Sequence, residues 1–229
     1  MSVLSVRGAG VRRRRRRRRG RDRDPWLFRG LDLTVEPGDL VAVAGPSGSG
    51  RTTLLLALAG KFRLATGAVE IDGRASLGYV PEVSDPESVF TVTEHVRERL
   101  MLLGRPRSEV GGVELHGLDP RKQGQDLSPY EKQVLGLVLA GLAFPAVIAL
   151  DGLDDGLDGR ERDALWQMLT EIAARGTAVL VTAREADPSR FTTVIRLGPD
   201  PAPEEPAENA PPGDEANQDA DPSDEEAKR

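Results

Sequence analysis

The segment Ala44-Gly45-Pro46-Ser47-Gly48-Ser49-Gly50-Arg51-Thr52-Thr53 decides the fold of this chain. An apolar run, Leu40–Ala44, leads into it and predicts a buried strand, and the leucine-rich run after it predicts a helix. A glycine-rich turn between a strand and a helix is typical of phosphate-binding loops. Glycine lets backbone N–H groups approach an anion closely, and the helix N-terminus adds further donors. The segment therefore predicts a nucleotide site.

Two positions of this loop carry specific expectations. Thr52 stands where a hydroxyl group reaches Mg²⁺ beside the phosphates. Arg51 stands where the usual pattern GxxxxGK[ST] has lysine, and its planar guanidinium is larger than an ammonium group. The predicted nucleotide contacts in the loop are Gly45, Pro46, Ser47, Gly48, Ser49, Gly50, Arg51, Thr52 and Thr53.

The composition excludes several kinds of site. The chain has 229 residues, a formal net charge of −6, two histidines and no cysteine. Disulfides, thiolate metal sites and cysteine nucleophiles are therefore absent, which fits a reducing compartment. The two histidines cannot form a metal site by themselves.

Charge is concentrated at the two ends of the chain. Residues 1–23 hold eleven arginines and one aspartate, net +10, whereas residues 199–229 hold eleven acids and two bases, net −9. We expect one domain over residues 1–198, a solvated loop at Arg12–Arg19 and an acidic disordered tail at 199–229. The alternative for the arginine run is a weak contact with nucleic acid or anionic lipid. No aromatic residue interleaves with the run to stack on bases, which argues against nucleic acid.

The sequence predicts a cytoplasmic protein. The arginine run is not followed by the apolar segment of a secretory signal. The longest uncharged stretch, residues 134–150, contains two glycines and a proline. It is marginal for a span of about 20 residues, and we interpret it as a buried helix followed by a buried strand.

Strand and helix patterns alternate along the chain. This alternation favours an α/β fold, a mostly parallel sheet with helices on its faces. Residues 104–126 are poor in apolar residues and predict an irregular connection. Predicted helices follow the loop to near Gly60 and cover Thr93–Leu103, Pro129–Leu142 and Glu161–Arg175. Predicted strands are Ser2–Val6, Trp26–Val35, Leu40–Ala44, Ala68–Ile71, Leu77–Val80, Ala146–Leu150, Thr177–Thr182 and Thr192–Leu197.

A second motif makes the nucleotide site more specific. The apolar run Val147–Leu150 ends in Asp151, and an aspartate at a strand end is what nucleotide-hydrolysing proteins use to hold the loop's Mg²⁺. With these two motifs, residues 2–197 resemble the ATP-binding cassette (ABC) family in order and spacing. Gly45–Thr52 is similar to its Walker A loop and Val147–Asp151 to its Walker B motif. The other matching segments are Tyr79–Glu82 (Q-loop), Leu127–Gln133 (signature), Asp155–Asp158 (D-loop) and Val181–Arg184 (switch histidine).

The resemblance implies a P-loop NTPase fold with a small antiparallel β subdomain and a shortened helical subdomain. It implies ATP and Mg²⁺ as cofactors, with Mg²⁺ between Thr52 and Asp151. It adds Glu82 and Ser128 to the nucleotide contacts. It also implies a second cassette and a membrane transport subunit as partners, which would place the protein at the inner face of a membrane.

Several positions depart from the family pattern. Gly152 stands where the family has its catalytic glutamate, and Ala183 where it has the switch histidine. Glu82 replaces a neutral glutamine, and Pro129 removes a backbone donor from the signature. We therefore expect no catalytic residue in the usual positions and impaired ATP hydrolysis. The alternatives are a non-enzymatic regulatory or interaction module on this fold, or an anionic-polymer binder acting through the arginine run.

Two aromatic residues upstream of the loop are candidates for stacking on adenine. The family places such a residue before its Walker A loop, and Trp26 and Phe28 stand in that region. A role for either side chain in the core or in a hairpin is the alternative.

Overall fold

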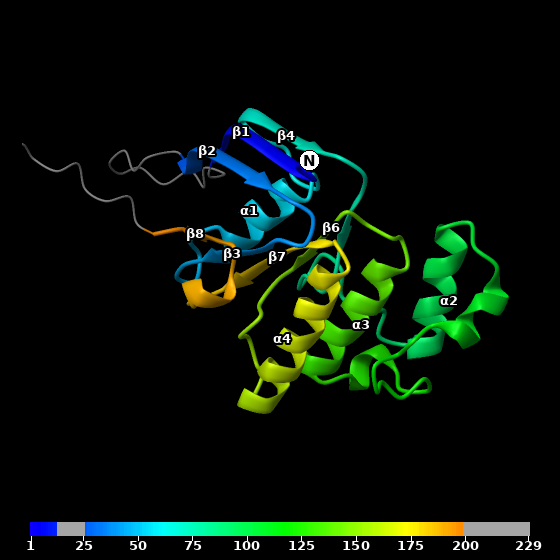
Figure 1. Ribbon diagram of the computed structural model, residues 1–229. Coiled ribbons are helices and arrows are strands. Elements are labelled where there is room, and N and C mark those ends of the chain that lie inside the picture. Colours follow the sequence, from blue (N-terminus) through cyan, green and yellow to red (C-terminus); the bar gives the residue numbers. More distant parts are fainter. Residues whose placement is uncertain (13–25, 199–229) are drawn as a thin grey trace, which may run out of the picture. The chain divides into compact units, whose positions relative to one another are not determined.

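The computed structural model describes residues 1–12 and 26–198 (Figure 1). The chain divides into two units, Met1–Pro199 and Asp200–Arg229, and the second lies outside the described residues. The predicted acidic tail and most of the predicted arginine loop, residues 13–19, therefore also lie outside them. Arg12 does not belong to a loop as expected, because it is the last residue of strand β1 (Leu4–Arg12), paired with Trp26.

A parallel sheet of five strands forms the centre of the first unit. Its strand order is β5-β6-β7-β3-β8, and every neighbouring pair is parallel. This confirms the predicted α/β class. The central strands β3, β6 and β7 are buried almost throughout and rich in apolar residues, as expected for strands covered on both faces. Their bounds are β3 Leu40–Ala44, β5 Ala75–Leu77, β6 Val147–Leu150, β7 Ala178–Ala183 and β8 Thr193–Arg196.

Alternate residues of these strands face two different layers. Val41, Val43 and Ala149 pack with helix α1 (Arg51–Leu58) and with the antiparallel strands in one core cluster. Ala42, Ala44 and their neighbours on the other face pack against α3 (Pro129–Gly141) and α4 (Gly159–Ala174). Figure 1 shows α3 and α4 side by side on that face. The two-residue period of the strands thus separates the layers.

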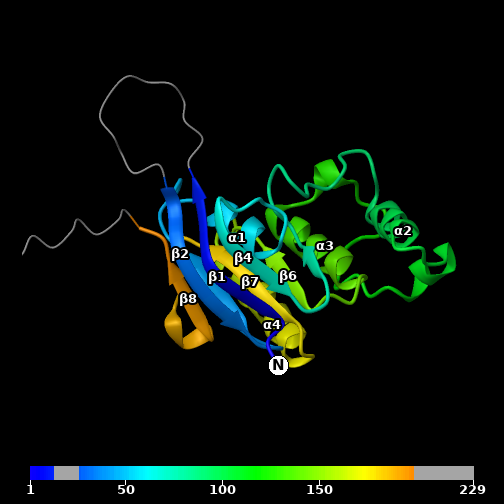
Figure 2. The same cartoon turned by 90° about the horizontal axis from the view of Figure 1, so that it is seen from above.

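The predicted antiparallel subdomain is a sheet of three strands in the order β2-β1-β4. Figure 2 shows β1 and β2 side by side, with β4 beyond them. Strand β2 covers Trp26–Val35, as expected, and β4 covers Thr66–Ile71. Strand β1 is longer than predicted because it pairs on both sides, and bulges interrupt its register near Gly8 and Gly10.

The helical part consists of α2 (Val92–Leu102), which packs on α3, and a connection without long helices. Thr91 begins α2 with a capping box to Glu94. The predicted irregular segment contains two short 3₁₀ helices, η1 (Arg107–Gly112) and η2 (Gly124–Asp126). A third, η3, covers Pro188–Arg190. Among the residues that the structure describes, no helix combines the length and the apolar character needed to cross a membrane.

Candidate nucleotide-binding site

The phosphate loop joins β3 to α1 at the carboxyl end of the sheet. Gly50 is the N-cap residue of α1 and has a φ of 98°. A Cβ at Gly50 would lie 2.5 Å from the side chain of Leu27 in β2. A Cβ at Gly45 would lie 2.2 Å from the carbonyl oxygen of Leu197, just after β8. The loop is therefore held between two neighbouring segments that leave no room for a side chain at these two glycines.

Two polar atoms of this loop are buried and unpaired within the described part of the chain. Ser49 Oγ and Arg51 Nη1 are both inaccessible to solvent and make no hydrogen bond with residues 1–12 or 26–198. Buried polar groups are nearly always paired, so an unpaired donor beside a phosphate loop indicates where a ligand's oxygens would bind. The residues present thus fit an anionic ligand, with Arg51 supplying the positive charge that lysine supplies in the usual pattern.

Thr52 and Asp151 lie together although 98 residues separate them in the sequence. Thr52 Oγ1 donates a hydrogen bond to Asp151 Oδ2 at 2.7 Å. Asp151 is 8% exposed, and its other carboxylate oxygen accepts a hydrogen bond from Thr182 of β7. A hydroxyl and a carboxylate in contact are suitable Mg²⁺ ligands when phosphate oxygens complete the coordination. The predicted metal pair is therefore brought together by the first turn of α1 and the ends of β6 and β7.

Gln133 of α3 is a site residue that the sequence reasoning did not single out. Its Nε2 donates hydrogen bonds to the backbone oxygens of Asp151, at 2.8 Å, and Gly152, at 3.2 Å. The residue is 2% exposed. It connects the helix that begins after Ser128 to the strand end that carries Asp151. Gln133 is the last residue of the signature segment Leu127–Gln133, and this position in the motif could have identified it from the sequence.

Gly152 lies in a backbone conformation that favours glycine. Its φ is 73°, and its N–H donates to Thr182 Oγ1 at 2.8 Å. A Cβ at this position would lie 3.0 Å from Asp155 Oδ2. A residue with a side chain at position 152, where the family has its glutamate, would therefore have a strained backbone and a close contact with the Asp155 carboxylate.

The end of β7 carries Ala183, which is 2% exposed and offers no polar side chain. The next residue, Arg184, contacts the loop after Asp151. Its N–H donates to Asp154 Oδ2 at 2.9 Å, and its guanidinium lies 3.4 Å from Asp155 Oδ1.

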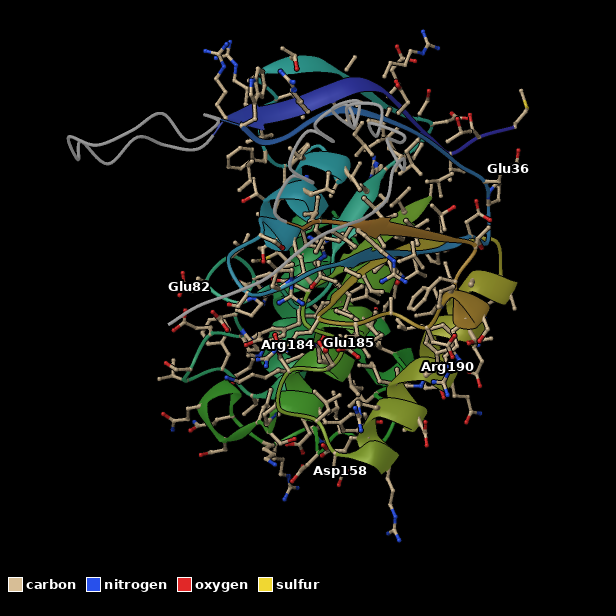
Figure 3. The ribbon with its side chains drawn as sticks, turned by 90° about the vertical axis from the view of Figure 1, so that its left-hand side faces the viewer. Glu36, Glu82, Asp158, Arg184, Glu185 and Arg190 are labelled. Atoms are coloured by element: carbon tan, nitrogen blue, oxygen red, sulfur yellow. The ribbon has the colours of Figure 1, made fainter. Side chains whose placement is uncertain are left out.

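Glu82 and Tyr79 belong to the segment after β5. Glu82 adopts φ of 63° and donates its N–H to Asp85 at 2.6 Å. Figure 3 shows its side chain at the edge of the molecule. Burial, a hydrogen bond with Asp85 and the charges of Asp85 and Asp151 raise the pKa of Tyr79 to about 12. Tyr79 therefore remains a neutral hydroxyl beside Asp151.

Ser128 makes its hydrogen bonds within the signature segment. Its Oγ accepts from the N–H of Glu131 at 3.2 Å, and Glu131 accepts from the N–H of Ser128 at 2.7 Å. Lys122 also binds Glu131 at 2.6 Å. The Ser128 hydroxyl proton is still available to a second acceptor. Glu131 brings a negative charge to this helix start, and Lys122 compensates it.

Replacing Glu131 with glutamine is expected to lower stability in a pH-dependent way. Burial by itself would raise the pKa of Glu131, but hydrogen bonds from Lys122 and Ser128 and the charge of Lys122 outweigh it and hold the pKa below its usual value. The stabilisation is thus fully present above about pH 4.5 and is lost as pH falls through the lowered pKa. We expect a loss of about 1 kcal/mol at pH 7.

Urea unfolding at pH 7 and at pH 3 measures this effect. The difference between Glu131→Gln and the unmodified chain is expected to shrink at pH 3. Glu98→Gln, at an exposed position of α2, is the matched control. An equal loss at both pH values would show that the charge of Glu131 does not matter.

The two aromatic candidates for adenine stacking have other contacts. The Arg12 guanidinium lies over the Trp26 ring, 4.9 Å from its centroid, and Phe28 packs against the core cluster beneath the antiparallel sheet. These contacts agree with the alternative roles considered for both side chains.

Comparisons with known proteins identify the family. The family model for ABC transporters matches residues 28–152. The zinc import ATP-binding proteins ZnuC of Jannaschia sp. and Chelativorans sp. are each 32% identical to the chain, over 69% and 80% of it and over 67% and 62% of their own lengths. The Nod factor export ATP-binding protein I of Rhizobium meliloti is 30% identical over 67% of the chain. The match spans 51% of that relative's length, so the chain covers between about half and two thirds of these proteins.

Solved structures support the fold. The dimeric structure of a bacterial ABC transporter cassette gives a TM-score of 0.70 at 18% identity, covering 85% of this chain and 94% of that one. The cbiO1 protein of Clostridium perfringens, part of the cbiONQ transporter complex, gives 0.68 at 16% identity, covering 86% and 84%. At these identities the likeness concerns the arrangement of the elements.

Proposed function

The chain belongs to the ATP-binding proteins of the ABC transporter family, and from this premise we propose that it binds Mg²⁺–ATP at residues 45–53 and hydrolyses it slowly or not at all. The nucleotide-binding domain occupies residues 1–198. One observation carries the proposal: the hydrogen bond between Thr52 and Asp151, which joins the phosphate loop to the end of β6.

Each part of the site has a role in binding. The backbone N–H groups of the loop and the N-terminus of α1 bind the phosphates, and Arg51 compensates their charge. Thr52 and Asp151 would hold Mg²⁺, and the bound ion would reduce the repulsion among the phosphate groups. Thr182 and Gln133 keep Asp151 in place through hydrogen bonds to its carboxylate and its backbone.

The same residues provide little for hydrolysis. Gly152 has no group that could orient or deprotonate an attacking water molecule, and Ala183 has none that could bind a terminal phosphate. Loss of one such group commonly lowers rates by about 10²–10³. Binding depends mainly on backbone donors, so it is expected to survive their loss.

We propose two partners, a second cassette and a membrane subunit that recruits the protein to the inner face of a membrane. The hydroxyl of Ser128, at the start of α3, would contact a nucleotide held by the second cassette. The alternative is a regulatory module in which nucleotide binding only sets the conformation. The positive φ of Gly152 favours this alternative, because it disfavours a catalytic side chain there. Hydrolysis that appears only on adding a competent cassette would support the partner role.

Binding is tested by thermal unfolding of the chain with and without Mg²⁺–ATP. A ligand at about 100 times its dissociation constant adds about 2.7 kcal/mol, which gives a clear rise in Tm. Asp151→Asn keeps the size of the side chain and removes the charge that binds Mg²⁺, so we expect it to abolish most of this rise.

Asp163→Asn, at an exposed position of α4, is the matched control and is expected to keep the full rise. The Tm of each variant without ligand shows whether it folds. No rise in Tm for the unmodified chain at millimolar ATP would refute the proposed site.

A further inference from the structure

We infer that a cavity beside the amino ends of β6 and β7 binds a single-chain amphiphile, a molecule with a hydrocarbon chain and one anionic head group. The cavity has a volume of about 900 Å³, within the range of roughly 300–1,000 Å³ that is usual for small-molecule sites. Among the residues that the structure describes, its lining shares none with the nucleotide site. The apolar lining, two strained residues and one cation without an acidic partner carry the inference.

The cavity lies at the end of the sheet away from the nucleotide site. Pro145 and Thr177 line it, and they stand just before β6 and β7 begin. Asp151 follows the carboxyl end of β6, and the two strands run parallel, so the nucleotide site is at their opposite ends. Helices α3 and α4, side by side in Figure 1, both contribute to the lining. A ligand in the cavity would therefore not compete with ATP.

The lining is apolar where the helices and the sheet contribute to it. Leu137 of α3 and Ile148 of β6 line the cavity and are 3% and 2% exposed. Met168 and Ile172 of α4 also belong to the lining. The connection between α2 and α3 adds little bulk, since a Cβ at Gly112 would have no atom within 4 Å. The connection leaves space beside these apolar side chains, and a hydrocarbon chain would gain free energy by filling it.

Two residues of the lining have a strained backbone. His116 and Phe144 have φ of 49° and 48°, in a region that residues with side chains rarely adopt. Such conformations cost free energy and are frequent at ligand sites. Phe144 is 82% exposed, and the Arg105 guanidinium lies 5.2 Å from the centroid of its ring. The ring of Phe144 thus offers apolar surface that a hydrocarbon chain entering the cavity would cover.

The charges of the lining favour an anionic head group. Arg105 Nε donates to Glu109 at 2.8 Å. His116 Nδ1 lies 3.6 Å from Glu114 Oε1, so these four lining residues are already in pairs. Arg175, the C-cap residue of α4, also lines the cavity, and the ion pairs within residues 1–12 and 26–198 leave it without an acidic partner. A guanidinium binds a carboxylate through parallel hydrogen bonds, so Arg175 is the group that selects the head.

Titration calorimetry of the whole chain with dodecanoate, below the concentration at which it forms micelles, tests the inference. We expect saturable binding of one equivalent. Decanoate should bind about tenfold more weakly, because each buried methylene group contributes a factor of about four. Dodecanol has the same chain without the charge and should bind about threefold to fivefold more weakly, the order expected for one exposed ion pair.

Two pairs of variants locate the ligand. Arg175→Gln should lower the affinity for dodecanoate to that for dodecanol and leave dodecanol binding unchanged. Arg160→Gln, exposed near the start of α4, is its matched control and should change neither affinity. Gly112→Leu places a side chain in the lining and should weaken both ligands about tenfold, as for the loss of two buried methylene groups. Gly111→Leu is the matched control, because a Cβ there also has no atom within 4 Å but the residue lies outside the lining.

The Tm of each variant without ligand shows whether it folds, and Arg175→Gln decides if Gly112→Leu does not. Binding of dodecanoate that does not saturate would overturn the inference, as would equal affinities of Arg175→Gln and Arg160→Gln for it. All four variants should keep the rise in Tm with Mg²⁺–ATP. Absence of that rise from the unmodified chain would refute the proposed nucleotide site and leave the amphiphile site standing.

Discussion

The purified chain is expected to hydrolyse Mg²⁺–ATP at least about 100-fold more slowly than the 1 s⁻¹ that is an ordinary order for a competent enzyme. Gly152 and Ala183 each lack a group on which phosphoryl transfer depends, and each loss commonly lowers rates by about 10²–10³. The effects of residues that act as a unit do not add, so the expected reduction in rate is at least that of one such loss, about 100-fold. Release of phosphate under saturating ATP measures the rate.

Restoring a carboxylate at Gly152 is not expected to restore turnover. The glutamate of Gly152→Glu would have to adopt φ near 73° with its Cβ 3.0 Å from Asp155 Oδ2. We expect a loss of about 1 kcal/mol in stability from the backbone alone. Adding Ala183→His leaves Glu82 and Pro129 as they are. Turnover near 1 s⁻¹ by the unmodified chain would contradict the account, and so would a rise to that rate with Gly152→Glu alone.

Gly136→Ala is expected to destabilise the fold by about 1–3 kcal/mol, although alanine is the better helix former. Gly136 lies within α3, and a Cβ there would come 2.3 Å from the backbone nitrogen of Tyr79. That atom belongs to the segment between β5 and Glu82 and cannot move without shifting the whole connection. For a protein of this size the loss corresponds to a Tm lowered by about 2–12 °C.

Gly141→Ala is the matched control because it makes the same change in the same helix. No atom lies within 4 Å of a Cβ at that position. It should be neutral or stabilising by up to about 1 kcal/mol. Thermal and urea unfolding of both variants measure the difference. Equal stabilities would show that α3 does not pack on the Tyr79 segment as closely as described.

Local patterns were sufficient to predict most of the fold. The runs Trp26–Val35 and Leu40–Ala44 are strands with the predicted bounds, and the Ser128 cap and Pro129 begin α3 as expected. The predicted strand Leu77–Val80 was wrong in its position, since β5 covers Ala75–Leu77. The end of β5 is determined by its pairing with β6 and by the hydrogen bond from the N–H of Asp151 to the carbonyl oxygen of Tyr79. Both contacts join distant parts of the chain, so a short window of sequence does not predict them.

The site was predictable where a motif is continuous and less so where distant elements meet. The phosphate loop and Asp151 follow from their own segments, and their contact follows from the parallel sheet. Gln133, Thr182 and Arg184 contact residues 151–155 although 18 to 31 positions of sequence separate the partners, so no local pattern assigns these contacts. The left-handed backbone of Gly152 is also a property of the folded loop.

A single-turnover measurement tests the central claim, that the chain binds ATP and leaves it intact. Excess protein is mixed with radiolabelled Mg²⁺–ATP, the protein-bound nucleotide is separated at intervals, and ATP and ADP are counted. We predict that label is retained on the protein as ATP, with little ADP after about 10 s, roughly ten times the lifetime at a rate near 1 s⁻¹. Conversion of bound ATP to ADP within seconds, or no retention of label by the unmodified chain, would contradict the claim.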